Sequence, residues 1–324
     1  MFKWIAEKRG VGMAPVLALT LLSTASFAAG LSMTWRNVNP PKSPPPVAGM
    51  AMAYDPIGKK VVSFGGYNGT AYSNDTWLFD GTTWTKATPA NSPPVRRATA
   101  MSFDRATGKL ILFGGYNGSQ YLGDTWIWDG SAETWTQANP THNPTPVTGP
   151  MMFTDPVNGR AEMFGGFDGN LYQGITWKWT GTDWRQLNPS KRPSGRAAAV
   201  VANDHAHKTV VIFGGIGEFD STNTWTWDGR TWTMQHPATQ PPMTTFSSAS
   251  FDPMLNEVVV FGGLQNGSTT WAWTGSDWTT VPTVYAPSTR QALGMAYDAE
   301  RKQLLIFGGQ LGEKFFSGTF KLVK

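Results

Sequence analysis

The sequence predicts an all-β protein, a single six-bladed β-propeller built from four-stranded antiparallel blades. A Phe-Gly-Gly motif recurs at intervals of 46 to 51 residues, and a tryptophan-rich segment follows each of the first five copies. A unit of about 40–50 residues with four short strands is typical of a propeller blade. The six motifs begin at Phe64, Phe113, Phe164, Phe213, Phe261 and Phe307.

The second repeat shows how one unit divides into four strands, which we expect over residues 97–104, 109–113, 124–129 and 134–138. Gly and Asn-Gly turns separate these segments, and prolines follow the last one. Alternation along the third strand places Trp126 and Trp128 on one face. We expect these tryptophan pairs to lie on the buried face of their strands, Trp177 and Trp225 included. No segment beyond residue 28 shows a helical period.

The two ends of the chain predict how the ring closes. The last repeat stops at its third strand, residues 319–322, and lacks a fourth. The segment 33–36 reads Met-Thr-Trp-Arg, which matches the fourth strand 83–86 of the first repeat. We therefore expect the N-terminal strand to complete the C-terminal blade, which removes the free edge of an open array.

These motifs resemble the Kelch repeat. In that family a diglycine follows an apolar strand, and an aromatic residue and a tryptophan follow at a fixed spacing. Here the spacing runs from Trp77 to Trp84 in the first repeat, and the resemblance extends over all six units. It implies a secreted six-bladed propeller at residues 29–324, a fold that serves both binding platforms and enzymes. We expect the diglycine to have a structural role, because glycine permits positive φ and close approach of backbones.

Residues 1–28 are expected to be a secretory signal peptide. Lys3, Lys8 and Arg9 precede a short apolar run, and Ser26 and Ala28 suit cleavage after Ala28. We therefore expect a periplasmic or extracellular protein with no membrane anchor. The absence of cysteine excludes disulfides, thiolate metal sites and cysteine nucleophiles. A net charge of +4 is too small and too scattered to indicate nucleic-acid binding.

No motif in the sequence identifies a metal, a cofactor or a catalytic set, and none is expected. The four histidines are spread along the chain without the three or four ligands that zinc requires. One aspartate recurs nine residues before each Phe-Gly-Gly motif, and a sixfold residue favours a turn role in which its side chain binds backbone N–H groups. These aspartates are Asp55, Asp104, Asp155, Asp204, Asp252 and Asp298.

An arginine set breaks the sixfold repetition. Seventeen residues before the motif, repeats two, four and six carry Arg96, Arg196 and Arg290, whereas the other repeats carry Val or Thr. We expect these residues near the mouth of the central channel. One interpretation is that each arginine caps loop carbonyls. The other is an anion site for a carboxylate, sulfate or uronate.

Loops between the second and third strands should lie on the same face as these arginines. Tyrosine and asparagine on a concave face suit a polysaccharide or a peptide, although such aromatic residues can also pack beneath their own loops. The candidate ligand-binding residues in these loops are Tyr67, Asn68, Tyr116, Asn117, Tyr121 and Tyr172.

The preferred functional interpretation is an exported, monomeric, non-catalytic binding module for a glycan or a protein, with an anionic ligand as one class. The alternative is a periplasmic or extracellular carbohydrate-active enzyme of the mutarotase or lyase kind, because exported bacterial sialic acid mutarotases are Kelch-like propellers too. An acid/base pair near the arginines would distinguish the two. Glu218, Asp220, Glu313 and Asp168 are the acidic candidates in the face loops.

Overall fold

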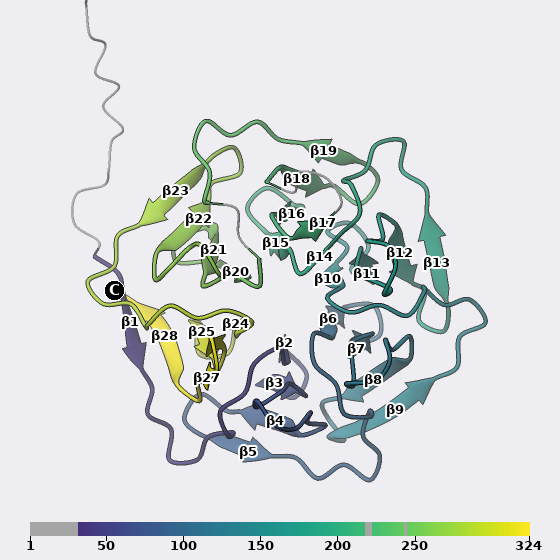
Figure 1. Ribbon diagram of the computed structural model, residues 1–324, viewed down its shortest axis with the longest axis horizontal. Coiled ribbons are helices and arrows are strands. Elements are labelled where there is room, and N and C mark those ends of the chain that lie inside the picture. The colour runs from purple at the N-terminus through teal and green to yellow at the C-terminus, as the bar shows by residue number, and fades with distance from the viewer. Residues whose placement is uncertain (1–31, 218–221, 243–244) are drawn as a thin grey trace, which may run out of the picture. The chain divides into compact units, whose positions relative to one another are not determined.

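Six four-stranded antiparallel sheets surround a central axis like the blades of a propeller (Figure 1). This computed structural model describes residues 32–217, 222–242 and 245–324. The predicted signal peptide, residues 1–28, lies outside the described residues. The described part forms one unit, Ser32–Lys324. None of it is helical, so it contains no helix that could span a membrane.

Each blade runs from a first strand at the axis to a fourth strand at the rim. Blade 1 comprises β2 (Ala51–Asp55), β3 (Lys60–Phe64), β4 (Thr76–Phe79) and β5 (Trp84–Lys86). Blade 2 comprises β6 (Ala100–Asp104), β7 (Lys109–Phe113), β8 (Thr125–Asp129) and β9 (Thr134–Ala138). Blade 3 comprises β10 (Met151–Thr154), β11 (Ala161–Phe164), β12 (Thr176–Trp179) and β13 (Trp184–Leu187).

The second half of the ring repeats this order. Blade 4 comprises β15 (Val200–Asp204), β16 (Thr209–Phe213), β18 (Thr224–Trp227) and β19 (Trp232–Met234). Blade 5 comprises β20 (Ser248–Asp252), β21 (Glu257–Phe261), β22 (Thr270–Trp273) and β23 (Trp278–Val281). Blade 6 comprises β24 (Gly294–Asp298), β25 (Gln303–Phe307), β28 (Thr319–Val323) and β1 (Thr34–Asn37). Two short pairs, β14 (Arg196–Ala197) with β17 (Ile216–Gly217) and β26 (Gln310–Leu311) with β27 (Lys314–Phe315), lie in loops.

The N-terminal strand closes the ring, as the sequence predicted. Strand β1 pairs antiparallel with β28, with Trp35 opposite Leu322. The side chain of Trp35 is fully buried and belongs to the same apolar cluster as Phe261 and Leu293. In Figure 1 the purple N-terminal strand lies beside the yellow C-terminal strand. Two ends of the chain therefore build one blade.

A tryptophan from every fourth strand locks its blade to the preceding one. Each of these side chains is at most 2% exposed, and each indole Nε1 donates a hydrogen bond of 2.8–2.9 Å to a threonine hydroxyl that begins the third strand of the preceding blade. The pairs are Trp35–Thr270, Trp84–Thr319, Trp135–Thr76, Trp184–Thr125, Trp232–Thr176 and Trp278–Thr224. We call this set the tryptophan–threonine layer.

The tryptophan pairs on the third strands differ from expectation. The second member is buried in every pair, as in Trp179 and Trp227, which are 0% and 1% exposed, whereas among the first members only Trp126 is buried, at 7% exposed. Trp177 and Trp225, expected to be buried, are only half-buried. Trp179 and Trp227 each contact the tryptophan of the next strand, at ring-centroid distances of 5.4 Å and 5.1 Å. Alternation put the pair on one face but could not show how far the neighbouring blade covers it.

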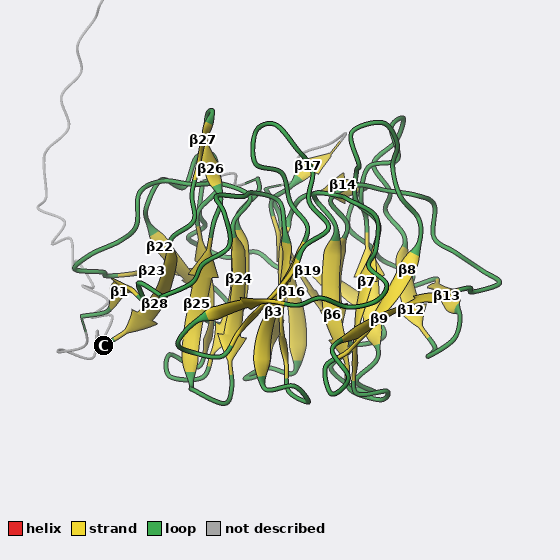
Figure 2. Ribbon diagram, turned by 90° about the horizontal axis from the view of Figure 1, so that it is seen from below, coloured by secondary structure: helices red, strands yellow, loops and turns green. Residues whose placement is uncertain are grey.

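Turns at the lower face confirm the predicted role of the recurring aspartate. In every blade its Oδ1 accepts a backbone N–H from two or three residues further on, at 2.8–3.1 Å. The diglycines are structural as well. Gly65 has φ of 74°, and a Cβ there would lie 2.6 Å from the carbonyl oxygen of Arg96. Long loops occupy the opposite, upper face, which is at the top in Figure 2.

A ring of backbone hydrogen bonds encircles the axis just above the first strands. One residue of each blade donates its N–H to the carbonyl of its counterpart in the preceding blade, at 2.7–3.2 Å, and the sixth bond closes the circle. All six residues have φ between 50° and 71°. We call this ring the girdle; its members are Gly49, Ala98, Gly149, Ala198, Phe246 and Ala292.

Candidate functional site

The axial channel is a cavity of about 1090 Å³ bounded by the first strands of the six blades. Its lining runs from loops above the girdle, such as Tyr116, to the lower rim at Tyr54 and Tyr297. This volume lies at the upper end of the range of about 300–1,000 Å³ that is usual for ligand pockets. The channel is therefore large enough to hold a ligand.

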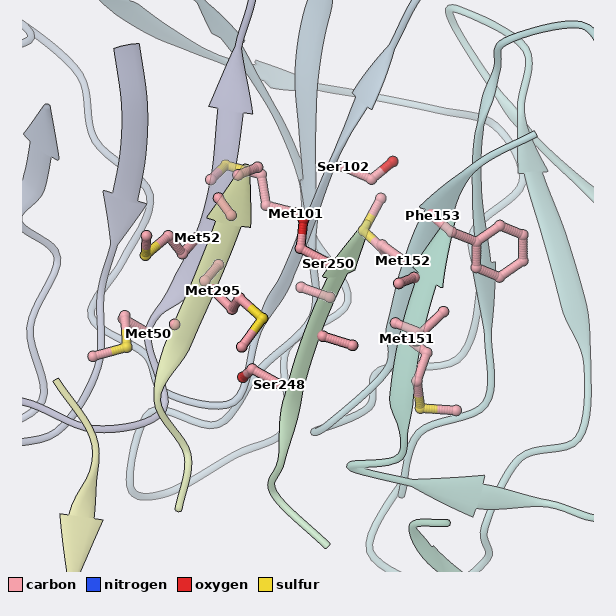
Figure 3. A pocket seen from close by; sticks show the side chains of 18 of the residues that line it. Met50, Met52, Met101, Ser102, Met151, Met152, Phe153, Ser248, Ser250 and Met295 are labelled. Atoms are coloured by element: carbon pink, nitrogen blue, oxygen red, sulfur yellow. The ribbon is translucent and has the colours of Figure 1, made fainter. Parts of the chain in front are cut away.

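Methionines dominate the middle of the channel wall. Six of the protein's 13 methionines belong to the lining. On the first strand of each blade, one residue pairs with the residue that precedes Phe-Gly-Gly on the second strand. We call these six equivalent residues the methionine level. Its members are Met52, Met101, Met152, Val201, Ala249 and Met295. Figure 3 shows methionine side chains from separate strands with Ser102, Ser248 and Ser250 near them.

Charge in the channel is confined to its two ends and is positive. Arg97 lies at the upper mouth, and Arg105 and His205 lie at the lower rim. Burial and the charge of Arg105 lower the pKa of His205, which favours its neutral form. Within the described residues no aspartate or glutamate lines the channel. The site thus offers an apolar interior with a cation at each entrance.

Arg97 at the upper mouth has an unusual environment for an arginine. Its guanidinium carbon lies 5.2 Å from the ring centroid of Tyr67 and 5.7 Å from that of Tyr72, within the range of cation–π attraction. In the described part of the chain no carboxylate lies within ion-pair distance of Arg97. Its backbone pairs with Tyr116 through two hydrogen bonds of 2.9 Å and 3.0 Å, which fixes its position. A half-buried guanidinium held by tyrosines still has N–H donors for an anion.

An arc of aromatic rings extends from this mouth over blades 6, 1, 2 and 3. Neighbouring ring centroids are 4.8–6.2 Å apart. The outer rings of blades 6, 1 and 2 also pack on a glycine of the next blade's loop, so that a Cβ on Gly118 would lie 2.8 Å from Tyr72. The arc consists of Phe315, Tyr67, Tyr72, Tyr116, Tyr121, Phe167 and Tyr172. It brings together all four tyrosines predicted for the site, half-buried rather than free.

The three arginines predicted to surround the axis do not line the channel. Arg96 and Arg196 are 0% exposed and Arg290 is 3% exposed. Each donates its Nε to a carbonyl two residues earlier and its Nη1 to the first glycine carbonyl of its own diglycine. This geometry corresponds to the loop-capping interpretation.

Individual partners complete the burial of these arginines. Arg96 forms a bidentate pair with Asp124, with both N···O distances 2.7 Å, and the bonded Arg96 holds the pKa of Asp124 low against the effect of its burial. Arg290 lies over Phe316 at 4.3 Å, and burial lowers its pKa to about 10. The guanidinium groups of these arginines therefore contact loop carbonyls and aromatic rings and do not line the channel.

The two predicted asparagines organise their loops. The Oδ1 of Asn68 accepts the backbone N–H groups of Thr70 and Ala71, and Asn117 does the same in the next blade. Tyr67 donates its hydroxyl to the carbonyl of Gly69 at 2.6 Å. These bonds hold the aromatic arc in place, because the loops that carry the rings are closed upon themselves.

The two acidic candidates that the structure describes, Glu313 and Asp168, lie apart from the channel. Glu313 is exposed at the tip of the β26–β27 hairpin, and Asp168 binds its own loop as Asn68 does. Glu218 and Asp220 lie outside the described residues. No group of three or more potential metal ligands of the His, Cys, Asp or Glu type occurs among residues 32–217, 222–242 and 245–324.

Arg97 and the methionine level were missed in the sequence. Sixteen residues before Phe-Gly-Gly, the other repeats carry Ala48, Thr148, Ala197, Thr245 and Gln291, so Arg97 is the one charged residue at that position. Counting one residue further along each repeat would have identified it. No comparable signal in the sequence distinguishes the methionines, because they resemble ordinary core residues unless the position of the central axis is known.

Comparisons with known proteins agree with this architecture. A family model described as the KLHDC2/KLHL20/DRC7 Kelch-repeats domain matches residues 31–192. A solved structure titled "Structure of YjhT" aligns with a TM-score of 0.69 at 17% identity, over 88% of this chain and 99% of that one. At this identity the likeness concerns the fold alone. No curated protein matches the sequence.

Proposed function

Since the chain belongs to the Kelch-repeat family, we propose that it is a non-catalytic binding module whose ligand docks at the upper mouth of the axial channel. The observation that carries this proposal is Arg97, whose guanidinium lies over Tyr67 and Tyr72 without a carboxylate partner in the described residues. The buried Arg96 binds loop carbonyls and Asp124, whereas the Arg97 guanidinium has no such carboxylate in the described residues. An unpaired guanidinium at a channel entrance is suited to an anionic group of a ligand.

The ligand classes that suit this mouth are a glycan or a protein segment that carries a negative charge. Tyr116 and Tyr121 line the mouth beside Arg97 and offer aromatic surface for a sugar ring or an apolar side chain. The signal peptide expected at residues 1–28 places this activity outside the cytoplasm, and we include export in the proposal.

A carbohydrate-active enzyme is the alternative, and the described channel gives it little support. Such an enzyme needs an acid and a base near the substrate, and the candidates that the sequence offered for these roles are carboxylates. The described lining has none, and Glu313 lies on an exposed hairpin away from it. Turnover of a bound ligand, lost in Glu218→Gln or Asp220→Gln, would make the enzyme the correct interpretation.

The proposal is tested by binding measurements on the protein and on Arg97→Gln. A glycan array identifies a ligand, and titration calorimetry then compares the variants. Loss of the charge-assisted hydrogen bonds should weaken an anionic ligand by roughly ten- to a hundredfold. Arg185→Gln is the matched control, because Arg185 is exposed on β13 at the rim.

The melting temperature of Arg97→Gln should stay close to that of the wild type, because Thr or Ala occupies the position in other blades. Arg97→Lys should recover part of the affinity, since it keeps the charge. Normal binding by a folded Arg97→Gln would disprove a site at the upper mouth.

A further inference from the structure

We propose that the ligand of this site is a single-chain anionic amphiphile, with its acidic head at Arg97 and its unbranched apolar chain inside the channel at the methionine level. This inference rests on the proposed site at Arg97 and goes beyond it, because it names a ligand class other than a glycan or a protein segment. Three features of the channel support it: the chemistry of its wall, the location of its charges, and its dimensions.

The wall at the methionine level has no charged group, and its members are four methionines, a valine and an alanine. Met52 is half-buried, so part of its side chain faces the open channel. Methionine is flexible and polarisable, and it adapts to an apolar chain without a fixed shape. Such a wall gains free energy when it covers hydrocarbon, whereas it offers a polysaccharide few hydrogen-bond partners.

The charges of the channel select the sign of the head group. The described lining carries Arg97 and Arg105 but no carboxylate. Arg97 precedes Ala98 of the girdle, and Met101 lies four residues further along the same segment, within β6. An extended strand advances about 3.3 Å per residue and the positive φ of Ala98 bends the segment, so the methionine level lies at most roughly 13 Å below Arg97. A head bound at Arg97 would therefore direct its chain toward Met101 and Met52.

The volume of the channel fits a chain with solvent beside it. About 1090 Å³ corresponds to roughly three dozen water molecules at ~30 Å³ each. Water confined between methionines and alanines makes few hydrogen bonds with the wall, so its displacement by hydrocarbon is favourable. Below the methionine level, the aromatic residues Tyr54, Phe103, Phe251 and Tyr297 line the lower rim.

The test measures binding of octanoate, decanoate and dodecanoate to the full-length protein by calorimetry below their micelle concentrations, with stoichiometry from native mass spectrometry. We expect one molecule per chain and a gain of roughly fifteenfold per two-carbon step, since each methylene removed from water contributes about fourfold. The matching alcohols supply the chain without the charge. They should bind more weakly than the carboxylates.

Two pairs of variants separate the head from the chain. Arg97→Gln should weaken dodecanoate by roughly ten- to a hundredfold and leave dodecanol unchanged. Met52→Gln introduces a polar group of similar size and should weaken dodecanoate far more than octanoate, whereas Met52→Leu keeps an apolar side chain and should weaken dodecanoate far less than Met52→Gln does. Melting curves of all variants identify any loss of fold, and Met52→Leu controls for repacking.

The outcomes distinguish this inference from the proposed function. Affinity that does not rise with chain length, or that is insensitive to Met52→Gln, would overturn the amphiphile while leaving a site at Arg97 intact. A glycan or peptide that depends on Arg97 while all alkyl probes fail would have the same meaning. If Arg97→Gln alters no ligand at all, both proposals fail. Binding to anionic vesicles that ignores Met52→Gln would indicate a surface contact and would also overturn the amphiphile.

Discussion

The tryptophan–threonine layer is the same in all six blades, whereas the upper mouth of the channel differs from blade to blade. The layer repeats the same buried contact in all six blades, with indole-to-hydroxyl distances of 2.8–2.9 Å throughout. The mouth is asymmetric: Arg97 occurs in one blade, and the aromatic arc extends over four. Sixfold repetition serves the packing of blades against one another, whereas a ligand meets one set of residues. Departures from the repeat are therefore the places to look for binding.

Removal of residues 33–38 should have the largest effect on the repeated layer. The deletion takes away β1, its pairing with β28 and the buried Trp35. A lost buried tryptophan alone costs about 3–5 kcal/mol, against a total stability of about 5–15 kcal/mol. We expect the truncated chain to unfold or to melt far below a chain that begins at Ser32. Equal melting temperatures would show that the ring does not need this strand.

Trp184→Ala should cost the layer more stability than any other single substitution proposed here. Its side chain is 2% exposed, contacts Phe113 at 5.6 Å and Trp179 at 5.4 Å, and donates to Thr125. We expect a loss of about 3–5 kcal/mol in the free energy of unfolding, measured by urea denaturation. Trp177→Ala is the matched control and should lose clearly less, because Trp177 is half-buried. Equal losses would contradict the assignment of the buried face.

Glu162 is a buried acidic residue between blades 3 and 4. We expect its titration to make the free energy of unfolding depend on pH. Its carboxylate lies 3.0 Å from Lys178 and accepts from Trp227 at 2.7 Å. Burial, followed by the charge of Asp155, raises the pKa of Glu162 to about 8. The folded state therefore holds a proton that the unfolded chain releases near pH 4–5, so stability falls as pH rises from there to about 8.

Glu162→Gln removes this titration. The wild-type stability should fall by up to about 1.4 kcal/mol per pH unit across that interval, and the variant should show a flatter profile. Thermal melts between pH 5 and pH 9 measure the difference. Parallel curves for the two proteins would mean that Glu162 stays ionised in the fold.

Thr176→Val should have the smallest effect. The substitution keeps the shape of the side chain and removes the hydroxyl that accepts from Trp232. A buried donor without a partner costs about 1–3 kcal/mol, and we expect a loss near the lower end. Thr136→Val, exposed on β9, is the control and should change stability by less than about 0.5 kcal/mol. If Thr176→Val loses no stability, only the apolar packing of the layer, and not its hydrogen bonds, stabilises the protein.

Features that the repeat itself carries were predictable from the sequence. The recurring aspartate needs only the turn that follows it, and the positive φ angles of the diglycine are likewise local. Closure by residues 33–36 followed from matching one incomplete repeat to another segment. Each of these depends on local geometry or on counting, which a single sequence contains.

The site was predictable only in part. The loop tyrosines were identified by type and place, and they do meet on one face. Arg96 was expected near the channel mouth, either as a loop cap or in an anion site; it is buried and binds Asp124, while its neighbour Arg97 lines the mouth over Tyr67. Adjacent residues on a strand point in opposite directions, so the periodicity of the repeat could not say which one faces the axis.

The sequence by itself determined the number of blades, their four strands, the closing strand and the turn residues, because these are set by periodicity and by interactions over a few residues. The tertiary structure alone decided the girdle, the methionine level and the exposure of Trp177 and Trp179. Those features arise where residues about 50 positions apart meet across blades. Their contacts depend on the curvature of the closed ring, which no local pattern records.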